Sequence, residues 1–167
     1  MKIGIFFGST TGNTASAADQ IKNDLSSLGE VDVINIANSS PAAMNDYDFV
    51  VLGVSTWGFG EIQEDWAGCE ALPGANLEGK KIALFGLGDQ SGFGDTFLDA
   101  MGILADAAEN AGGTIIGHWP TDGYDFGGCT ALRDGKFVGL ALDDDNQSNL
   151  TAERITQWTI LLQNELK

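Results

Sequence analysis

The chain has 167 residues, with 24 acidic against 8 basic side chains and a formal net charge of −16 at pH 7. This length suits a single domain over residues 1–167 with a full hydrophobic core. Nucleic acid is excluded as a partner, because phosphate binding needs clustered Lys and Arg. No apolar run reaches the length of a membrane span, and the first residues are typical of a strand rather than a signal peptide. We therefore expect a cytoplasmic protein without membrane insertion.

The first part of the chain predicts a strand, a tight loop and a helix N-terminus. Ile3–Phe7 is apolar, Gly8–Thr14 contains only Gly, Ser, Thr and Asn, and apolar residues then recur at helical spacing from Ala15 to Leu28. A helix N-terminus offers free backbone N–H groups and the positive end of the helix dipole to an anion. The loop contains no Lys or Arg and matches neither a Walker A nor a dinucleotide motif. A phosphate bound here would be neutralised by amides, hydroxyls and the helix dipole.

The middle of the chain predicts two further strands and a second glycine-rich loop. Val31–Asn35 reads as a short strand, and 39–44 as a loop with a possible helical turn. Phe49–Val54 is continuously apolar, which is typical of a strand covered on both faces, and the loop Ser55–Gly60 follows it. Helical spacing predicts a helix from Glu64 to Leu72, ended by Pro73-Gly74.

The rest of the chain repeats this alternation. Lys81–Gly86 predicts a buried strand, and Leu87–Gly94 forms a third polar loop. A helix then places Phe97, Met101, Leu104, Ala105 and Ala108 on one face. The last strand starts at Ile115, is interrupted by a polar loop from 120 to 136, and resumes at Phe137–Leu140. A closing helix carries Ile155, Trp158, Leu162 and Leu166, with Thr151 as its expected N-cap.

Alternating strands and helices predict a parallel sheet with helices on both faces. Ligands bind such sheets at the carboxyl ends of the strands, where strand order reverses. The three loops follow three such ends, so we expect them to form one site.

Cysteine and histidine are too few for a zinc site or a disulfide framework. The chain has two cysteines, Cys69 and Cys129, and one histidine, without a Cys-x-x-Cys motif. We expect two buried free thiols. The acidic run Asp143–Asp145 lacks EF-hand spacing, so no metal ligands are predicted.

Five motifs in register resemble the flavodoxins of the long-chain kind, over essentially the whole chain. They are the Ser9–Thr14 loop, Thr56-Trp57, Gly88-Asp89-Gln90, Thr121–Phe126 and Leu142–Gln147. The resemblance implies a flavodoxin-like three-layer sandwich with a five-stranded parallel sheet, helices on both faces and an insertion in the last strand. The strand order 2-1-3-4-5 is a known property of flavodoxins and enters only through this resemblance.

The resemblance also implies bound FMN and its contacts, without catalytic residues or metal. The residues that match the family's FMN contacts are Ser9, Thr10, Thr11, Gly12, Asn13, Thr14, Ser55, Thr56, Trp57, Gly58, Phe59, Gly60, Leu87, Gly88, Asp89, Phe93, Phe97 and Asp145. The loop from Ser9 to Thr14 would hold the phosphate, and Trp57 would stack on the flavin ring. Asp89 would meet the pyrimidine end and Asp145 the ribityl region.

Two positions depart from the common pattern of the family. Phe93 stands where most relatives carry a Tyr on the outer flavin face, so the stacking surface stays while the hydroxyl is lost. Gly58 follows the Trp where some relatives carry Asn, and Gly reaches positive φ at little cost. We expect Gly58 to ease the peptide flip that, in the family, stabilises the neutral semiquinone.

The resemblance implies a low-potential one-electron carrier that cycles FMN between semiquinone and hydroquinone. Its acidic surface would dock basic patches on a flavodoxin/ferredoxin reductase and on an electron acceptor, and we expect a monomer. The main alternative is an FMN-dependent NAD(P)H:quinone reductase of the same fold, but no basic residue lies near the loops to bind a nicotinamide phosphate. A phosphoacceptor receiver domain would need an acidic cluster where the first strand ends in Phe7-Gly8-Ser9.

Overall fold

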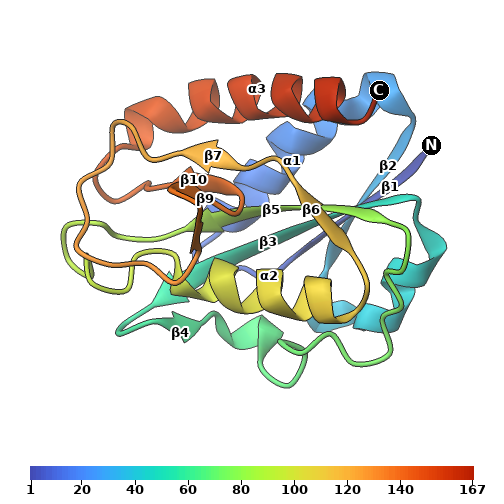
Figure 1. The fold of residues 1–167 in the computed structure, drawn as a ribbon, viewed down its shortest axis with the longest axis horizontal. Coiled ribbons are helices and arrows are strands. Elements are labelled where there is room, and N and C mark those ends of the chain that lie inside the picture. The colour runs from blue at the N-terminus through green and yellow to red at the C-terminus, as the bar shows by residue number, and fades with distance from the viewer.

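A parallel sheet lies between two layers of helices in the computed structural model, which describes all residues 1–167 (Figure 1). The sheet order is β10-β5-β3-β1-β2, and all of these strands are parallel. The strands are β1 (Lys2–Phe7), β2 (Glu30–Asn35), β3 (Phe49–Trp57), β5 (Lys81–Leu87) and β10 (Leu140–Leu142). The expected flavodoxin-like topology is confirmed.

The last strand of the sheet is divided, as the sequence predicts. β6 (Thr114–Ile116) pairs with the start of β5, and β10 pairs with its end. Strand pairing of the insertion differs from the prediction, because Phe137 belongs to β9 and the parent sheet resumes only at Leu140. The backbone of Leu84 lies so close to Gly139 that a Cβ there would stand 2.1 Å from the Leu84 oxygen.

Continuous apolar runs form the central strands because both faces of the sheet are covered. Val50, Val51 and Leu52 in β3 have no exposed surface, and neither do Ile82 to Phe85 in β5. They belong to one hydrophobic core of 43 buried residues. Gly53 leaves room for the ring of Phe85, whose Cζ would lie 2.1 Å from an added Cβ.

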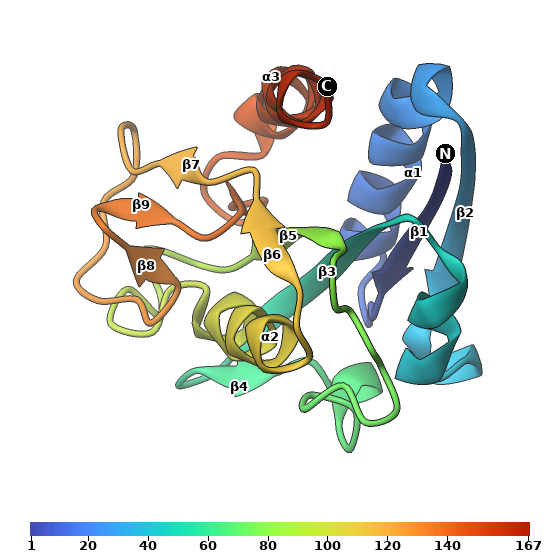
Figure 2. The ribbon, with the colours of Figure 1, turned by 45° about the vertical axis from the view of Figure 1, so that its right-hand side comes forward.

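The helices divide between the two faces of the sheet. α1 (Asn13–Leu25) and α3 (Ser148–Glu165) cover one face, and α2 (Asp99–Asn110) covers the other (Figures 1 and 2). Gln20 Nε2 donates to the Ala152 oxygen at 2.9 Å, which joins α1 to α3. Short 3-10 helices fill the connections: η1 (Ser26–Leu28), η2 (Ile36–Asn38), η3 (Pro41–Asp46) and η4 (Glu64–Trp66). None of the helices combines the length and apolarity that crossing a membrane requires.

The helix predicted from Glu64 to Leu72 is wrong. Only the single turn η4 forms, followed by turns in which Gly68 and Leu72 adopt positive φ angles of 81° and 53°. The apolar spacing instead reflects anchoring of an irregular segment, since Trp66 and Leu72 are buried and Trp66 Nε1 donates to the Gly53 oxygen at 3.0 Å. Before it, β4 (Glu61–Ile62) folds back antiparallel on the end of β3.

The N-cap predicted at Thr151 is also wrong. α3 begins one turn earlier at Ser148 with Gln147 in the N-cap position. The Thr151 hydroxyl donates to a carboxylate oxygen of Asp144, so the side chain serves the preceding loop. Helix starts are hard to locate in a polar run that offers several capping residues.

The insertion, residues 117–139, forms a small antiparallel sheet of order β7-β9-β8. Its strands are β7 (Trp119–Pro120), β8 (Leu132–Arg133) and β9 (Lys136–Phe137). It packs on the main domain through an aromatic cluster of Phe97, Tyr124, Phe126 and Phe137, with ring centroids 5.2–6.0 Å apart.

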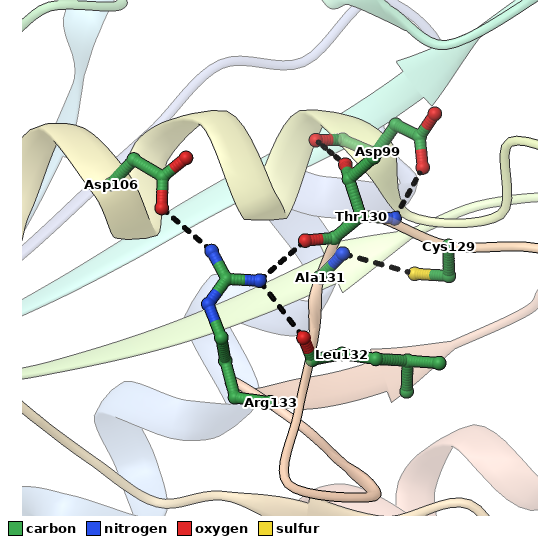
Figure 3. A network of polar contacts seen from close by, with 7 residues as sticks. All are labelled: Asp99, Asp106, Cys129, Thr130, Ala131, Leu132 and Arg133. Carbon is green, nitrogen blue, oxygen red and sulfur yellow. Dashed lines mark hydrogen bonds and ion pairs between the residues drawn. The ribbon is translucent and has the colours of Figure 1, made fainter.

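Polar contacts fasten the insertion to α2 (Figure 3). Arg133 Nη2 pairs with Asp106 Oδ1 at 2.6 Å, while Arg133 Nη1 donates to the carbonyls of Thr130 and Leu132 at 2.6 and 2.9 Å. Thr130 N donates to Asp99 Oδ1 at 2.8 Å in the first turn of α2. The Cys129 sulfur accepts from Ala131 N at 3.3 Å. Cys129 and Cys69 are free thiols as expected, but both are half-buried rather than buried.

Candidate functional site

A cavity of about 350 Å³ lies at the carboxyl ends of β1, β3 and β5. The three loops singled out in the sequence meet there, together with the acidic turn before α3. The lining residues are Thr10, Thr11, Asn13, Thr14, Ser55, Thr56, Trp57, Gly58, Leu87, Gly88, Asp89, Phe93, Asp144 and Asp145. The cavity falls within the size range of small-molecule and cofactor sites.

The Gly8–Thr14 loop presents free backbone donors to one end of this cavity. Gly12 adopts φ +94° immediately before α1, and the first helical bond runs from Ser16 N to the Gly12 oxygen at 2.9 Å. The backbone N–H groups of Thr10, Thr11, Asn13 and Thr14 donate to no protein acceptor. Four free donors at the positive end of a helix dipole suit an anion.

Gln63 and Asp65 support this loop from behind. Gln63 Nε2 donates to Thr10 Oγ1 at 3.0 Å, and Gln63 Oε1 accepts from Asp65 N at 3.1 Å. The Asp65 carboxylate accepts from Ser9 N at 3.0 Å. Gln63 is 1% exposed, so its amide is fixed by packing. Sequence reasoning missed both residues, because Asp65 lies in the segment predicted as a regular helix, Glu64–Leu72, and Gln63 immediately precedes it.

Two aromatic side chains line the other end of the cavity. Trp57 and Phe93 are each 40% exposed, which is unusual for side chains of this size. Trp57 Nε1 donates to Ser55 Oγ at 2.8 Å, and Phe93 packs edge-on against Phe59 with centroids 5.9 Å apart. Both rings are held by neighbours while a large surface stays open, which suits a planar ligand.

Thr56 and Gly58 flank Trp57 and shape the loop that carries it. Gly58 has φ +51°, a conformation that favours glycine, and an added Cβ would meet nothing closer than 3.9 Å. Thr56 Oγ1 accepts from Ala100 N at 3.0 Å, so its hydroxyl caps the first turn of α2. The backbone at Gly58 therefore has conformational freedom on a loop whose base is fixed.

Carboxylates surround the open side of the cavity. Asp89 Oδ1 accepts from Ser91 N, Gly92 N and Asn146 Nδ2, and the Gly92 and Asn146 bonds lower the pKa of Asp89 from its ordinary value. Burial and the neighbouring Asp89, Asp143 and Asp144 raise the pKa of Asp145. Asp144 lines the cavity but was not predicted, although it lies within the acidic run Asp143–Asp145. No group of three or more His, Cys, Asp or Glu side chains is arranged to hold a metal ion.

Five of the predicted site residues do not line the cavity. Ser9, Gly12, Phe59 and Gly60 belong to its loops without facing it. Phe97 is 1% exposed and packs in the aromatic cluster under the insertion, so the structure assigns it to the core. The Phe97 ring packs beneath the loop that contains Gly88. An added Cβ on Gly88 would lie 3.1 Å from this ring.

The arrangement suits an elongated ligand with an anionic group at one end and a planar ring at the other. Comparison with known proteins is consistent with this geometry. A family model described as Flavodoxin matches residues 5–158. The flavodoxin of Trichodesmium erythraeum (strain IMS101) is 48% identical over 166 residues, covering 98% of this chain and 97% of that protein. Flavodoxin 2 of Escherichia coli (strain K12) is 47% identical over 169 residues, covering 99% and 97%.

Solved structures agree with the sequence relatives. The crystal structure of Fusobacterium nucleatum flavodoxin bound to flavin mononucleotide superimposes with a TM-score of 0.92. It is 32% identical, and the match covers 98% of each chain.

Proposed function

Because this chain belongs to the flavodoxin family, we propose that the cavity residues described above bind its FMN and that the surrounding acidic surface docks its redox partners. The protein is an FMN-based electron carrier, and other redox proteins exchange electrons with it. Bound FMN supplies the one-electron chemistry, while the protein supplies binding, orientation and electrostatics. The insertion at residues 117–139 within the last strand supports the long-chain kind.

The Gly8–Thr14 loop binds the phosphate of FMN in this proposal. The free N–H groups of Thr10, Thr11, Asn13 and Thr14 supply donors, and the dipole of α1 favours a negative charge at this place. No Lys or Arg is present in the loop. Phosphate binding would thus rest on hydrogen bonds from backbone amides and on the helix dipole rather than on a side-chain charge.

Trp57 and Phe93 hold the flavin ring in this proposal. The observation that carries it is the combination, in one cavity, of free amide donors at one end and two half-exposed aromatic side chains at the other. Asp89 Oδ2 accepts no hydrogen bond from the protein and can accept an N–H group from a ligand edge. Gly58 has no side chain and reaches positive φ at little cost, which would let its peptide turn to accept a proton donor on the ring.

The charge around the cavity favours a low reduction potential. Asp89, Asp144 and Asp145 line the cavity, and Glu61 on β4 pairs with Trp57 at the end of β3. One carboxylate about 10 Å from an added electron costs roughly 0.4 kcal/mol in water and about 1.7 at an effective dielectric of about 20. At about 59 mV per tenfold for one electron, each charge lowers the potential by roughly 20 to 70 mV.

The basic residues lie largely away from the cavity. Lys2 and Lys81 begin β1 and β5, at the opposite end of the parallel strands, and Lys81 Nζ bonds the Glu165 carbonyl at 2.9 Å near the C-terminus. The cavity end is therefore strongly negative, and we propose that it orients the protein toward basic patches on a reductase and on an acceptor. The rate of association should then fall steeply as salt rises, and a rate that stays flat would exclude electrostatic steering.

Further properties follow from the surface. Apart from Phe59, which is 86% exposed beside the cavity, the exposed large apolar side chains outside the cavity are scattered, as at Ile103 and Ile160, which supports a monomer. The free thiols Cys69 and Cys129 suit the reducing cytoplasm. We also propose that the chain transforms no substrate of its own.

The test of this function is anaerobic reduction of the purified protein, first with NADPH alone and then stepwise with a chemical reductant. We expect NADPH to leave the bound FMN oxidised and the reductant to reduce it in two separate one-electron steps. Reduction by NADPH alone would instead indicate a reductase.

Variants test the two ends of the cavity separately. Thr14 is 2% exposed and lines the cavity, so Thr14→Val should weaken FMN binding about tenfold while changing riboflavin binding little, since only FMN carries the phosphate. Thr159→Val, at a buried hydroxyl between α1 and α3, is the matched control. Phe93→Ala should weaken both ligands, with Ile103→Ala as its surface control.

A further inference from the structure

A buried carboxylate lies behind the cavity, immediately after β10. Asp143 has no exposed surface, yet it does not pair with any cation. Its Oδ2 accepts from Gln90 N at 3.1 Å and from Gln90 Nε2 at 2.7 Å, and its Oδ1 accepts from Asn146 N at 3.0 Å. A buried carboxylate requires donors of this kind, so its position is strongly determined by them.

Asn146 connects this buried group to the cavity. Its Nδ2 lies 2.9 Å from Asp143 Oδ2 and 3.1 Å from Asp143 Oδ1, and 2.8 Å from Asp89 Oδ1. Because Asn146 N also donates to Asp143, both the backbone and the amide of Asn146 are fixed by the same carboxylate. The amide therefore reaches Asp89 from a rigid base.

The far side of the network is anchored in the insertion. Gln90 Oε1 accepts from Asp125 N at 2.7 Å, and Gln147 Oε1 accepts from Gln90 Nε2 at 3.0 Å and from Arg154 Nη1 at 2.7 Å. Arg154 is 8% exposed and lies 4.1 Å from the centre of the Tyr124 ring. Two glutamine amides thus separate the buried anion Asp143 from the buried cation Arg154, and they hold both in place.

Asp89 is the one member of this network that lines the cavity. Three donors, Ser91 N, Gly92 N and Asn146 Nδ2, bond to its Oδ1 at 3.1, 2.7 and 2.8 Å. Its Oδ2 is left without a protein donor. Two of the donors are backbone groups of its own loop, and Asn146 is the only side chain that sets the direction of the carboxylate from outside.

We propose that Asn146, held by the buried Asp143, is a positioning residue that directs the free oxygen of Asp89 toward the flavin. This inference rests on the proposed placement of FMN beside Asp89. A carboxylate fixed at the ring edge disfavours the additional negative charge of reduced FMN more than a mobile, fully hydrated one does. Asn146 therefore lowers the reduction potential without contacting the cofactor.

The experiment uses Asn146→Ala, which removes the bridge without changing the net charge. Asn146 is exposed, so the variant should fold. We expect the ratio of its affinities for oxidised and reduced FMN to fall about threefold. At about 59 mV per tenfold for one electron, this corresponds to a reduction potential about 28 mV higher. Asn149→Ala, an exposed asparagine in the first turn of α3, is the matched control and should leave the potential unchanged.

Two further readouts separate positioning from a general structural effect. Asn146→Ala should raise the pKa of the Asp89 carboxyl, followed by carbon-13 NMR, because one of its donors is lost. In an Asp89→Asn background, Asn146→Ala should no longer change the potential. If its effect persists undiminished there, Asn146 does not act through Asp89 and the proposal is overturned.

The NMR titration is performed with and without FMN, which distinguishes the two levels of inference. Failure of the native chain to bind FMN would overturn the proposed site while the Asp89 titration still tests the contact with Asn146. An unchanged pKa of Asp89 in Asn146→Ala would overturn the positioning role even in a protein that binds FMN normally.

Discussion

Replacing Gly8 with alanine tests how the Gly8–Thr14 loop is supported. The added Cβ would lie 2.2 Å from Gln63 Oε1, 2.9 Å from Asp65 Cβ and 3.0 Å from Trp66 Cδ1. None of these neighbours moves easily, because Gln63 and Trp66 are 1% and 0% exposed and Trp66 bonds the backbone of β3. The clash must therefore displace Gln63 and with it the bond to Thr10 Oγ1.

The expected cost follows from overpacking and a lost hydrogen bond. Forcing a methyl into a packed site costs about 1–3 kcal/mol, and the lost Gln63–Thr10 bond costs about 1 more. A lower entropy of the unfolded chain offsets about 0.4–1 kcal/mol. We expect a net loss of about 2 kcal/mol, or on the order of 4–8 °C in melting temperature for a domain of this size.

Thermal unfolding of the FMN-free protein measures this cost, and FMN titration measures the effect on the loop. FMN affinity should fall while the far end of the cavity keeps its shape. Gly86→Ala, whose added Cβ would lie no closer than 3.1 Å to any atom, is a graded control with a smaller expected cost.

A double-mutant cycle decides whether Gln63 is the cause. Gln63→Ala removes the atom nearest to the new methyl, so adding Gly8→Ala to it should cost about 1 kcal/mol less than in the native chain. Strictly additive costs would refute the reasoning, as would a Gly8→Ala protein as stable as the native one.

Three further predictions concern the rest of the fold. Burial raises the pKa of Tyr124 to about 12, and burial together with the bond to Asp32 raises the pKa of Tyr47 to about 12. Because the folded state binds these protons more tightly, the free energy of unfolding should be intact below pH 10 and fall as pH rises toward 12. Unfolding measured alongside tyrosinate absorbance checks this. Burial raises the pKa of the Cys129 thiol to about 12, so iodoacetamide at pH 8 should modify Cys129 only after unfolding, as mass spectrometry can show. Gly53→Ala should destabilise more than Gly8→Ala in the same melts, because its Cβ would lie 2.1 Å from a ring atom of the fully buried Phe85.

The parallel sheet could be predicted from sequence because its signals are local. Continuous apolar runs in β3 and β5, with glycine-rich loops after them, specify buried strands and the edge at which their ends meet. The FMN site itself entered through family motifs. Neither route identifies Gln63 and Asp65, whose role depends on the chain reversal between β3 and β4 that no periodicity records.

Apolar spacing misled the prediction where an irregular segment is anchored at intervals. Trp66 and Leu72 lie in the segment predicted as a helix, but they are buried by a chain that turns at Gly68. Phe137 misled for a related reason: it is apolar where a strand pattern resumes, and it instead packs under the insertion against Phe97. Aromatic clusters between segments far apart in sequence leave no local pattern, so tertiary contact decides such positions.

The absence of cations from the Gly8–Thr14 loop fits the charge of the whole molecule. A Lys at this place would bind phosphate more strongly, but it would also partly cancel the negative field at the ring end of the same cavity. Backbone amides and the dipole of α1 bind an anion while adding no net charge, and their influence falls off within the first helical turn. The formal net charge of −16 can then act undiminished on the electron and on the approach of a basic partner. Binding and electrostatic tuning are thus assigned to different chemical groups, the first to main-chain donors and the second to carboxylates such as Asp89, whose position depends on Asn146.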